Sequence, residues 1–276
     1  MQDLLARARA ELRHEPIERR VRASLGAQTV VDSTRAVLVW EPRRVVPSYA
    51  VPAVDIRAEL SPAPASGEEV AGVLHPRVPF AVHTAAGEPV SIGDRVAAGF
   101  RLADEDLGGH VVLDFGAFDA WFEEDERIAG HPRDPFHRVD VRQSSRPVRI
   151  ELDGEVVAET TRARLLFETS LPVRFYVPRE DVRVPLHAGV MRSYCPYKGQ
   201  ASYWSAELRG RREEDLAWSY EQPLPDAVAI TGLVAFWDER VDVVFDGERR
   251  PPPGGAVADS LRDEFGVPRR PAEPRA

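Results

Sequence analysis

An internal repeat constrains the fold of this chain more than any other feature of its sequence. Residues 21–41 align with residues 148–168 at a shift of 127 positions and without a gap. The identical pairs in this stretch are Val21/Val148, Arg22/Arg149, Leu25/Leu152, Val30/Val157, Thr34/Thr161, Arg35/Arg162, Ala36/Ala163, Leu38/Leu165 and Glu41/Glu168. Residues 51–60 then align with residues 177–186 at a shift of 126. Similar stretches in the same order predict a tandem duplication of one folding unit.

Each copy is predicted to be a β domain. Short valine-rich runs alternate with glycine and proline, which is the pattern of antiparallel strands joined by turns. Residues 120–128 and 235–241 also resemble each other, and we take them as a third anchor of the repeat. We therefore expect a mainly β protein of two homologous small antiparallel β domains, arranged as a pseudo-dimer with approximate two-fold symmetry.

The expected boundaries follow from changes in the residue pattern. Leu4, Leu5, Ala8 and Leu12 recur at helical spacing, so residues 2–14 are expected to form a short N-terminal helix. The predicted segments are an N-terminal helix (1–15), the first repeat with the connector between the copies (16–140), the second repeat (141–248) and a disordered tail (249–276) with one helical turn at 260–265. The connector, residues 131–138, is expected to be stiff and exposed because two prolines flank Arg133 and Asp134.

Composition limits the classes of function. The formal net charge is −9, which argues against a nucleic-acid partner because such proteins need a basic face. No stretch approaches the ~20 apolar residues that a membrane span requires, and the N-terminal segment lacks the apolar run of a signal peptide. One cysteine rules out a disulfide within the chain and a zinc site of several cysteines. We expect a cytoplasmic protein, a monomer or weak oligomer, with no membrane or nucleic-acid partner.

Residues 194–204 concentrate the reactive side chains of the chain. This stretch reads Tyr-Cys-Pro-Tyr-Lys-Gly-Gln-Ala-Ser-Tyr-Trp and contains the only cysteine, Cys195, and the only lysine, Lys198. A proline two residues before the Lys-Gly pair favours a fixed turn, which Gly199 completes. Tyr203 and Trp204 are expected to start a strand and to direct one ring to each of its faces. Residues 79–88 occupy this place in the first copy and contain no lysine.

The second copy resembles domain-of-unknown-function family 427, a family of bacterial proteins. The resemblance covers about residues 147–248 and is carried by Arg174-x-Tyr176-x-Pro178-x-Glu180-Asp181-Val182-Arg183, Cys195-Pro196-Tyr197-Lys198-Gly199-x-Ala201-x-Tyr203-Trp204, Ala217-Trp218-Ser219-Tyr220-x-x-Pro223 and Gly232-x-Val234-Ala235-Phe236. The first copy and the connector resemble the longer, two-copy members of the family. The resemblance implies a compact antiparallel β domain, often compared with tent-like folds that cradle ligands. The family is sometimes labelled nucleotidyltransferase-like, and no established reaction comes with the resemblance.

These observations predict a pocket around Lys198 that binds a small, anionic molecule, with or without catalysis. Lys198 and Cys195 are the candidate catalytic residues: a desolvated lysine is a nucleophile, and a nearby ammonium activates a thiol. The expected ligand-binding residues are Lys198, Arg174, Tyr197, Tyr203, Trp204 and Arg183. No cofactor is expected, and no metal, because the histidines share no ligand spacing.

Each candidate also has a structural interpretation. Lys198 can pair with a nearby carboxylate, Cys195 can be a small buried apolar residue, and most of the aromatic rings can be core packing. Arg183 and Arg162 have counterparts in the first copy, which favours structural ion pairs with Asp181 and its counterpart Asp55. Arg174 has none, and is therefore the better ligand candidate. Two other functions stay open: a non-catalytic protein-interaction module and a nucleotidyltransferase-like enzyme, for which Glu180, Asp181 and Glu207 are the available carboxylates.

Overall fold

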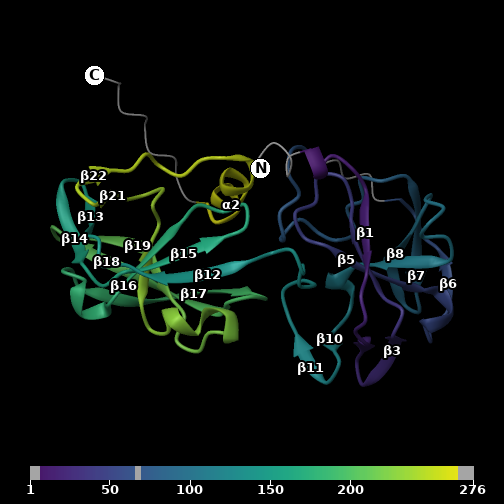
Figure 1. The fold of residues 1–276 in the computed structure, drawn as a ribbon. Coiled ribbons are helices and arrows are strands. Elements are labelled where there is room, and N and C mark those ends of the chain that lie inside the picture. Colours follow the sequence, from purple (N-terminus) through teal and green to yellow (C-terminus); the bar gives the residue numbers. More distant parts are fainter. Residues whose placement is uncertain (1–6, 66–69, 267–276) are drawn as a thin grey trace. The chain divides into compact units, whose positions relative to one another are not determined.

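The computed structural model describes residues 7–65 and 70–266. The chain divides into two compact units (Figure 1), unit 1 ending at Asp134 and unit 2 beginning at Pro135. Each unit is described by itself. All strand pairings between the named strands are antiparallel, which confirms the mainly β, antiparallel prediction.

Unit 1 contains strands β1 to β11 and two short 3-10 helices. Its strands are β1 (Arg13–Pro16), β2 (Val21–Leu25), β3 (Gln28–Ser33), β4 (Val37–Trp40), β5 (Ser48–Pro52), β6 (Leu60–Pro62), β7 (Gly87–Ile92), β8 (Arg95–Leu102), β9 (His110–Leu113), β10 (Ala120–Glu123) and β11 (Glu126–Ile128). The helices are η1 (Ala53–Asp55) and η2 (Phe115–Ala117).

Unit 2 contains strands β12 to β22, two 3-10 helices and one α-helix. Its strands are β12 (Val139–Gln143), β13 (Val148–Leu152), β14 (Glu155–Thr160), β15 (Arg164–Glu168), β16 (Arg174–Val177), β17 (Leu186–Cys195), β18 (Gly199–Leu208), β19 (Arg211–Ser219), β20 (Val234–Phe236), β21 (Asp242–Phe245) and β22 (Glu248–Arg249). The helices are η3 (Arg179–Asp181), η4 (Pro225–Ile230) and α2 (Ala256–Glu264).

The two units share one sheet topology, as the repeat predicts. Unit 1 has a seven-stranded sheet in the order β1-β4-β5-β9-β8-β7-β6 and a four-stranded sheet in the order β11-β10-β2-β3. Unit 2 has sheets of the same sizes, in the orders β12-β15-β16-β20-β19-β18-β17 and β14-β13-β21-β22. Counting strands in chain order, each strand of unit 1 has a counterpart at the same place in unit 2. The bounds of β2 and β13 differ by the 127 positions that the sequence alignment gives, and those of η1 and η3 by 126.

The third anchor of the repeat is wrong as a structural equivalence. Trp121 lies in β10 and pairs with Ala23 of β2, whereas Phe236 lies in β20, the counterpart of β9. The residue that occupies the place of Trp121 is Val243, which pairs with Ile150 of β13. Both strands contain a buried aromatic residue and are followed by acidic residues, which accounts for the similarity of the two sequences.

The core of each unit lies between its two sheets. In unit 2 it combines side chains of the four-stranded sheet, such as Ile150 and Val243, with side chains of the seven-stranded sheet, such as Phe175. The opposite face of the seven-stranded sheet is also buried, since Tyr176, Tyr203 and other residues form a second cluster there with residues of η4. Because both faces of β16 are covered, its Phe175-Tyr176-Val177 run is continuously apolar rather than alternating.

The predictions for the two ends of the chain need correction. Residues 1–6 of the expected N-terminal helix lie outside the described residues; Arg7 and Ala8 are helical, but Arg13–Pro16 forms strand β1. Its pairing with β4 supplies backbone hydrogen bonds that the helical spacing did not reveal. The tail is ordered over α2, where Val257 and Ala258 are buried. Residues 267–276 of the expected disordered tail lie outside the described residues.

The connector is less exposed than expected. His131 and Pro132 are buried, while Pro135 and Phe136 are exposed. The His131 ring also contacts the Pro132 carbonyl at 2.7 Å. None of the helices in the part of the chain that the structure describes combines the length and the apolar character of a membrane span.

Candidate functional site

The Lys198 turn is held in place by the loop that precedes η4. Cys195 pairs with Gly199 at the end of the β17–β18 hairpin, and residues 196–198 form the turn between them. The Leu224 amide donates to the Lys198 carbonyl at 3.1 Å. Gly199 has a φ of +92°, and a Cβ there would lie 3.4 Å from the Gln222 carbonyl oxygen and the Leu224 nitrogen. The expected turn is therefore present, and it needs glycine at this position.

The side chain of Lys198 is buried and paired with Glu168. The Lys198 ammonium donates a short hydrogen bond to the Glu168 carboxylate at the end of β15. His137, which precedes β12, contacts the same carboxylate through Nε2 at 3.0 Å. Only 9% of the Lys198 side chain and 7% of the Glu168 side chain are exposed to solvent. Glu168 thus brings together two polar partners that lie 31 positions before it and 30 positions after it in the sequence.

This pairing fixes the charges of both groups. Burial alone would raise the pKa of Glu168, but the Lys198 ammonium and His137 lower it to about 2. Burial alone would lower the pKa of Lys198, but the carboxylate of Glu168 raises it above its ordinary value. Tyr176 and Tyr220 lie in the same buried environment, and desolvation raises the pKa of each phenol. At neutral pH the site therefore contains an ionised Lys–Glu pair among neutral tyrosines.

Unit 1 has the equivalent buried carboxylate without a lysine. Glu41 aligns with Glu168 in the repeat and is almost fully buried. It contacts His83 Nδ1 at 2.7 Å and accepts hydrogen bonds from the Thr84 and Ala85 amides at 2.7 and 3.1 Å. His83, like His137, stacks on an aromatic ring: His83 on Phe100, and His137 on Tyr197.

Strand pairing shows which residue replaces the lysine. In the seven-stranded sheet of unit 2, four residues on neighbouring strands pair in a row: Tyr176, Ala235, Trp218 and Tyr203. The corresponding row in unit 1, in the same order, is Ala50, Val112, Phe100 and Pro89. Counting back from Tyr203 and Pro89 places Lys198 at the position of Thr84. Unit 1 therefore satisfies Glu41 with hydrogen bonds from a histidine and backbone amides, without a lysine.

The aromatic candidates are mostly packed in the core. Tyr197 and Tyr203 are buried, and Tyr203 belongs to the cluster on the outer face of the seven-stranded sheet, where its hydroxyl lies 2.8 Å from Ser193 Oγ. Trp204 points to the other face, where it packs against the core between the sheets and Arg179 lies 3.8 Å over its ring. The expectation that Tyr203 and Trp204 face opposite sides of the strand is confirmed. Cys195 is partly buried and lies close enough to interact electrostatically with the Lys198 ammonium.

Arg174 forms a buried ion pair with residues other than those around Lys198. Its guanidinium donates two hydrogen bonds to Glu239, at 2.9 and 2.7 Å, and lies 3.7 Å from Asp238. The rings of Trp218 and Trp237 flank the same guanidinium at 5.6 and 5.7 Å. Burial alone would lower the pKa of Arg174, but the two carboxylates raise it.

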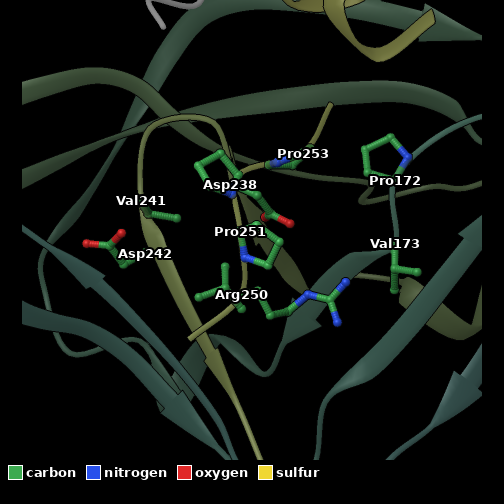
Figure 2. Close-up of a pocket in the computed structure, with 10 residues that line it drawn as sticks. Pro172, Val173, Asp238, Val241, Asp242, Arg250, Pro251 and Pro253 are labelled. Carbon is green, nitrogen blue, oxygen red and sulfur yellow. The ribbon is translucent and has the colours of Figure 1, made fainter. Parts of the chain in front are cut away.

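Asp238 lines a small pocket of about 50 Å³ below the proline-rich segment that follows β22 (Figure 2). This pocket has room for only a few water molecules. Burial raises the pKa of Asp238 to about 6, although Arg174 acts in the opposite direction. Burial has the larger effect on this carboxyl because the close, bidentate partner of Arg174 is Glu239, whereas Asp238 lies 3.7 Å from the guanidinium.

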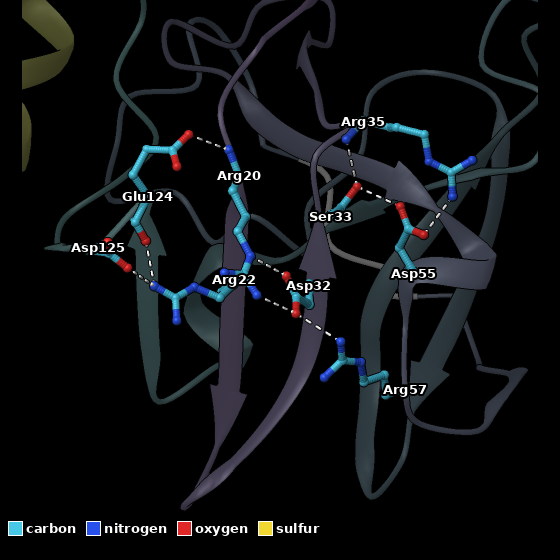
Figure 3. A network of polar contacts seen from close by, with 9 residues as sticks. All are labelled: Arg20, Arg22, Asp32, Ser33, Arg35, Asp55, Arg57, Glu124 and Asp125. Atoms are coloured by element: carbon cyan, nitrogen blue, oxygen red, sulfur yellow. Dashed lines mark hydrogen bonds and ion pairs between the residues drawn. The ribbon is translucent and has the colours of Figure 1, made fainter.

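Arg183 takes part in an ion pair that both units repeat. It donates to Glu159 at 2.7 Å, and Arg57 donates to Asp32 at 2.8 Å at the same place in unit 1 (Figure 3). The neighbouring pairs also recur: Arg162 with Asp181 at 2.9 Å, and Arg35 with Asp55 at 2.6 Å. The side chains of Ser33 and Thr160 donate to the same aspartates at 2.7 and 2.6 Å. The predicted pairs with Asp181 and Asp55 are therefore present for Arg162 and Arg35. Arg183 and Arg57 pair instead with Glu159 and Asp32.

The structure gathers part of the predicted site and adds two residues. Lys198, Tyr197 and Cys195 lie together, whereas Arg174 and Arg183 pair with carboxylates elsewhere in unit 2. Glu168 and His137 were not among the predicted site residues. Glu168 could have been recognised, because it is one of the identical pairs of the repeat and the only acidic one. His137 gave no comparable signal.

One further group in the described residues could hold a metal ion: His14, Asp104 and Asp106 of unit 1, whose ligand atoms all lie within 4.8 Å of one another. His14 Nε2 lies 3.7 Å from Asp106. Asp104 and Asp106 are exposed or partly so, and the group is part of no other site described above.

The fold and the site define unit 2 as a two-sheet antiparallel β domain with a buried Lys–Glu pair at a hairpin turn. Residues 140–247 match the model of a family described as Domain of unknown function (DUF427). The resemblance expected from the sequence is confirmed for these residues. No curated protein matches the chain.

Proposed function

We propose that unit 2 binds a small anionic molecule at the Lys198 turn, with the Lys198–Glu168 pair and His137 as the polar centre of the site. The observation that carries the proposal is the replacement of Lys198 by Thr84 in unit 1. Unit 1 satisfies the same buried carboxylate with His83 and two backbone amides. A lysine is therefore not needed to neutralise this carboxylate, and its retention in unit 2 favours a role beyond packing.

The chemistry of the turn suits an anion. An ammonium carries three donor hydrogens, and the Lys198 ammonium donates one of them to Glu168. The ring of His137 contacts the same Glu168 oxygen as the Lys198 ammonium does, so the two polar partners of Glu168 lie close to each other. Tyr197, stacked on His137 at 4.2 Å between ring centroids, holds that ring in place.

A binding experiment tests the proposal with inorganic phosphate, pyrophosphate and citrate as probes. Titration calorimetry compares the wild-type chain with Lys198→Met, and with Arg209→Met as a control that removes an exposed cation of the same unit. We expect at least one probe to bind and Lys198→Met to weaken it about tenfold, the usual effect of losing a charge-assisted hydrogen bond. Because Lys198→Met leaves the Glu168 charge buried, the double variant Glu168→Gln/Lys198→Met is measured as well. Binding that is equal in the double variant and the wild type refutes the proposal.

Catalysis is tested separately from binding. Cys195 and Lys198 are the residues to examine, since the thiol and the ammonium lie close together. A nucleophilic Cys195 would react with iodoacetamide faster in the wild type than in Lys198→Met, because the ammonium stabilises the thiolate. Equal reaction rates of Cys195 in the wild type and in Lys198→Met would show that Lys198 does not activate the thiol, and the site would then be proposed as a binding site only.

A protein-interaction module is the second candidate, and one observation favours it. Val190 and Tyr194 of the edge strand β17 are exposed, and Val190 is almost fully so.

Nucleotidyl transfer has less support, because Asp181 pairs with Arg162 and Glu207 contacts His187 at 3.3 Å rather than Lys198. We propose that the protein is located in the cytoplasm. Fractionation of cells that express the chain tests this location.

A further inference from the structure

Two ion pairs join neighbouring hairpin turns in unit 2. Arg209 of the β18–β19 turn donates a short hydrogen bond to Glu155, which starts β14. Arg211 donates to Asp153 of the β13–β14 turn at 2.7 Å. The two pairs lie side by side and tie the seven-stranded sheet to the four-stranded sheet at one end of the domain.

Unit 1 cannot form either pair. Leu25 pairs with Gln28 in unit 1, and Leu152 pairs with Glu155 at the equivalent place in unit 2. The residue equivalent to Asp153 is therefore Gly26, and the residue equivalent to Glu155 is Gln28. Ile92 pairs with Arg95 in unit 1, and Leu208 pairs with Arg211 at the equivalent place in unit 2. The residue equivalent to Arg209 is therefore Gly93, and the residue equivalent to Arg211 is Arg95. Of the four charged residues in unit 2, only the counterpart of Arg211 is retained.

A groove of about 520 Å³ opens in unit 1 where these side chains are missing. It is lined by the β2–β3 turn, the segment after η1 and the β7–β8 turn, with Leu25, Gly26, Arg57, Glu59, Asp94 and Arg95 among its walls. The groove therefore lies wholly within unit 1, and the Lys198 site is not part of it.

Arg95 keeps its charge in this groove, and its contacts with carboxylates are longer than those of its counterpart Arg211. Its contacts to Asp119 are 3.3 and 3.4 Å long and its contact to Asp94 is 3.8 Å, against 2.7 Å for Arg211 and Asp153. Its Nε is buried and has no hydrogen-bond partner among the described residues. Asp119 itself is held by the Gly26 amide at 2.6 Å. The Arg95 side chain is 43% exposed, so its guanidinium can donate shorter hydrogen bonds to a ligand carboxylate than it donates to Asp119.

We infer that the groove of unit 1 binds a small molecule that carries one carboxylate and a short apolar chain. The carboxylate takes the place that Asp153 occupies in unit 2 and accepts from Arg95, because a planar carboxylate matches the guanidinium fork. The apolar chain lies against Leu25 and Val30, which line the groove. Glu59 and Asp94 oppose a multiply charged anion such as phosphate. This inference is independent of the function proposed for unit 2.

The test uses the full chain and two matched probes, 4-methylpentanoate and 4-methylpentanamide. Titrations are followed in ¹H–¹⁵N spectra, where the amides of Gly26, Ala58 and Gly93 report on the groove. We expect the carboxylate to shift these signals and the amide to bind about tenfold more weakly, since it lacks the charge-assisted hydrogen bond. Arg95→Gln is expected to weaken the carboxylate by a similar factor.

Restoring the residues of unit 2 should close the groove. In Gly26→Asp/Gly93→Arg, both new side chains take backbone conformations that Asp153 and Arg209 already hold, with φ values of +51° and +49°. A Cβ at Gly26 meets nothing within 4 Å, and one at Gly93 meets Ala58 Cβ at 3.7 Å. This variant should fold and lose the carboxylate response at Ala58. Four results would overturn the inference. The acid and the amide could bind equally well, or inorganic phosphate could bind more tightly at the same amides. The shifts could also be confined to the Lys198 turn, or Arg95→Gln and the double variant could both bind the acid as the wild type does.

Discussion

Glu41 and Glu168 are the same buried carboxylate in two copies of one domain, and each copy neutralises it with different donors. Glu41 relies on His83 and backbone amides, whereas Glu168 relies on Lys198 and His137. Because the position stayed acidic while its partners changed, the carboxylate is the constant element and the lysine is the variable one. Four predictions concern this site and its surroundings.

The Lys198–Glu168 pair should show strong coupling in a double-mutant cycle. Glu168→Gln leaves the Lys198 ammonium buried without a counterion, and Lys198→Met leaves the Glu168 carboxylate buried without one. Each single substitution should lower the free energy of unfolding by about 3–5 kcal/mol. The double variant should lose less than the sum, since it leaves no unpaired charge. Urea denaturation of the four proteins measures this. Additive losses would show that the two groups do not stabilise each other.

Acid should destabilise unit 2 through Glu168. Its pKa is about 2 in the folded chain against an ordinary value of 4.5. A lowered folded-state pKa stabilises the fold above the unfolded pKa, and that contribution is lost as the pH falls from about 4.5 to 2. The full difference corresponds to about 3 kcal/mol. Urea denaturation of the wild type and of Glu168→Gln between pH 6 and pH 2 should show a steeper loss for the wild type; parallel curves would contradict the assignment.

Asp238 should act in the opposite direction. Burial raises its pKa to about 6 against an ordinary value of 3.8, so the protonated carboxyl favours the folded chain below pH 3.8, and this advantage is lost as the pH rises through 6. Asp238→Asn keeps a neutral side chain at every pH. The variant should therefore be more stable than the wild type at pH 8, by about 3 kcal/mol at most, and similar to it at pH 4. Unfolding free energies at the two pH values decide this, and an unchanged difference would show that Arg174 keeps Asp238 ionised.

Gly199→Ala should destabilise the Lys198 turn. Its φ of +92° is one that L side chains rarely adopt, and the added Cβ would touch the 222–224 loop at 3.4 Å, so we expect a loss of about 1–3 kcal/mol. Gly210→Ala is the matched control, because its φ is +73° and no atom lies within 4 Å of the added Cβ. The control should lose less, about 1 kcal/mol. Thermal unfolding measures both, and equal losses would mean that the contact with the 222–224 loop does not matter.

The sequence predicted the fold better than the site. The repeat and its glycine and proline pattern were enough to predict two antiparallel β domains, because strand periodicity and turn residues are local properties. The order of strands in each sheet, and the failure of the third anchor at Trp121 and Phe236, depend on pairings between distant segments. The paired arrangement of the two domains stays a prediction.

For the site, the sequence identified Lys198 and its turn but not their partners. Lys198 stands out because the chain uses arginine everywhere else. Its partner Glu168 lies 30 positions earlier, and His137 a further 31. Arg174 looked available for a ligand because its partner Glu239 is 65 positions away. A residue pattern shows which side chains are unusual, whereas long-range pairing decides which of them are already engaged.

The contact between His137 and Glu168 determines where the second domain can be cut from the chain. A fragment that starts at residue 141, where the repeat was expected to begin, would lack His137 and the first two residues of β12, and it would leave one side of the Glu168 carboxylate open to solvent. A fragment that starts at Pro135 keeps the strand and the imidazole together. A fragment used to express unit 2 alone should therefore begin at or before His137, two residues before the first strand.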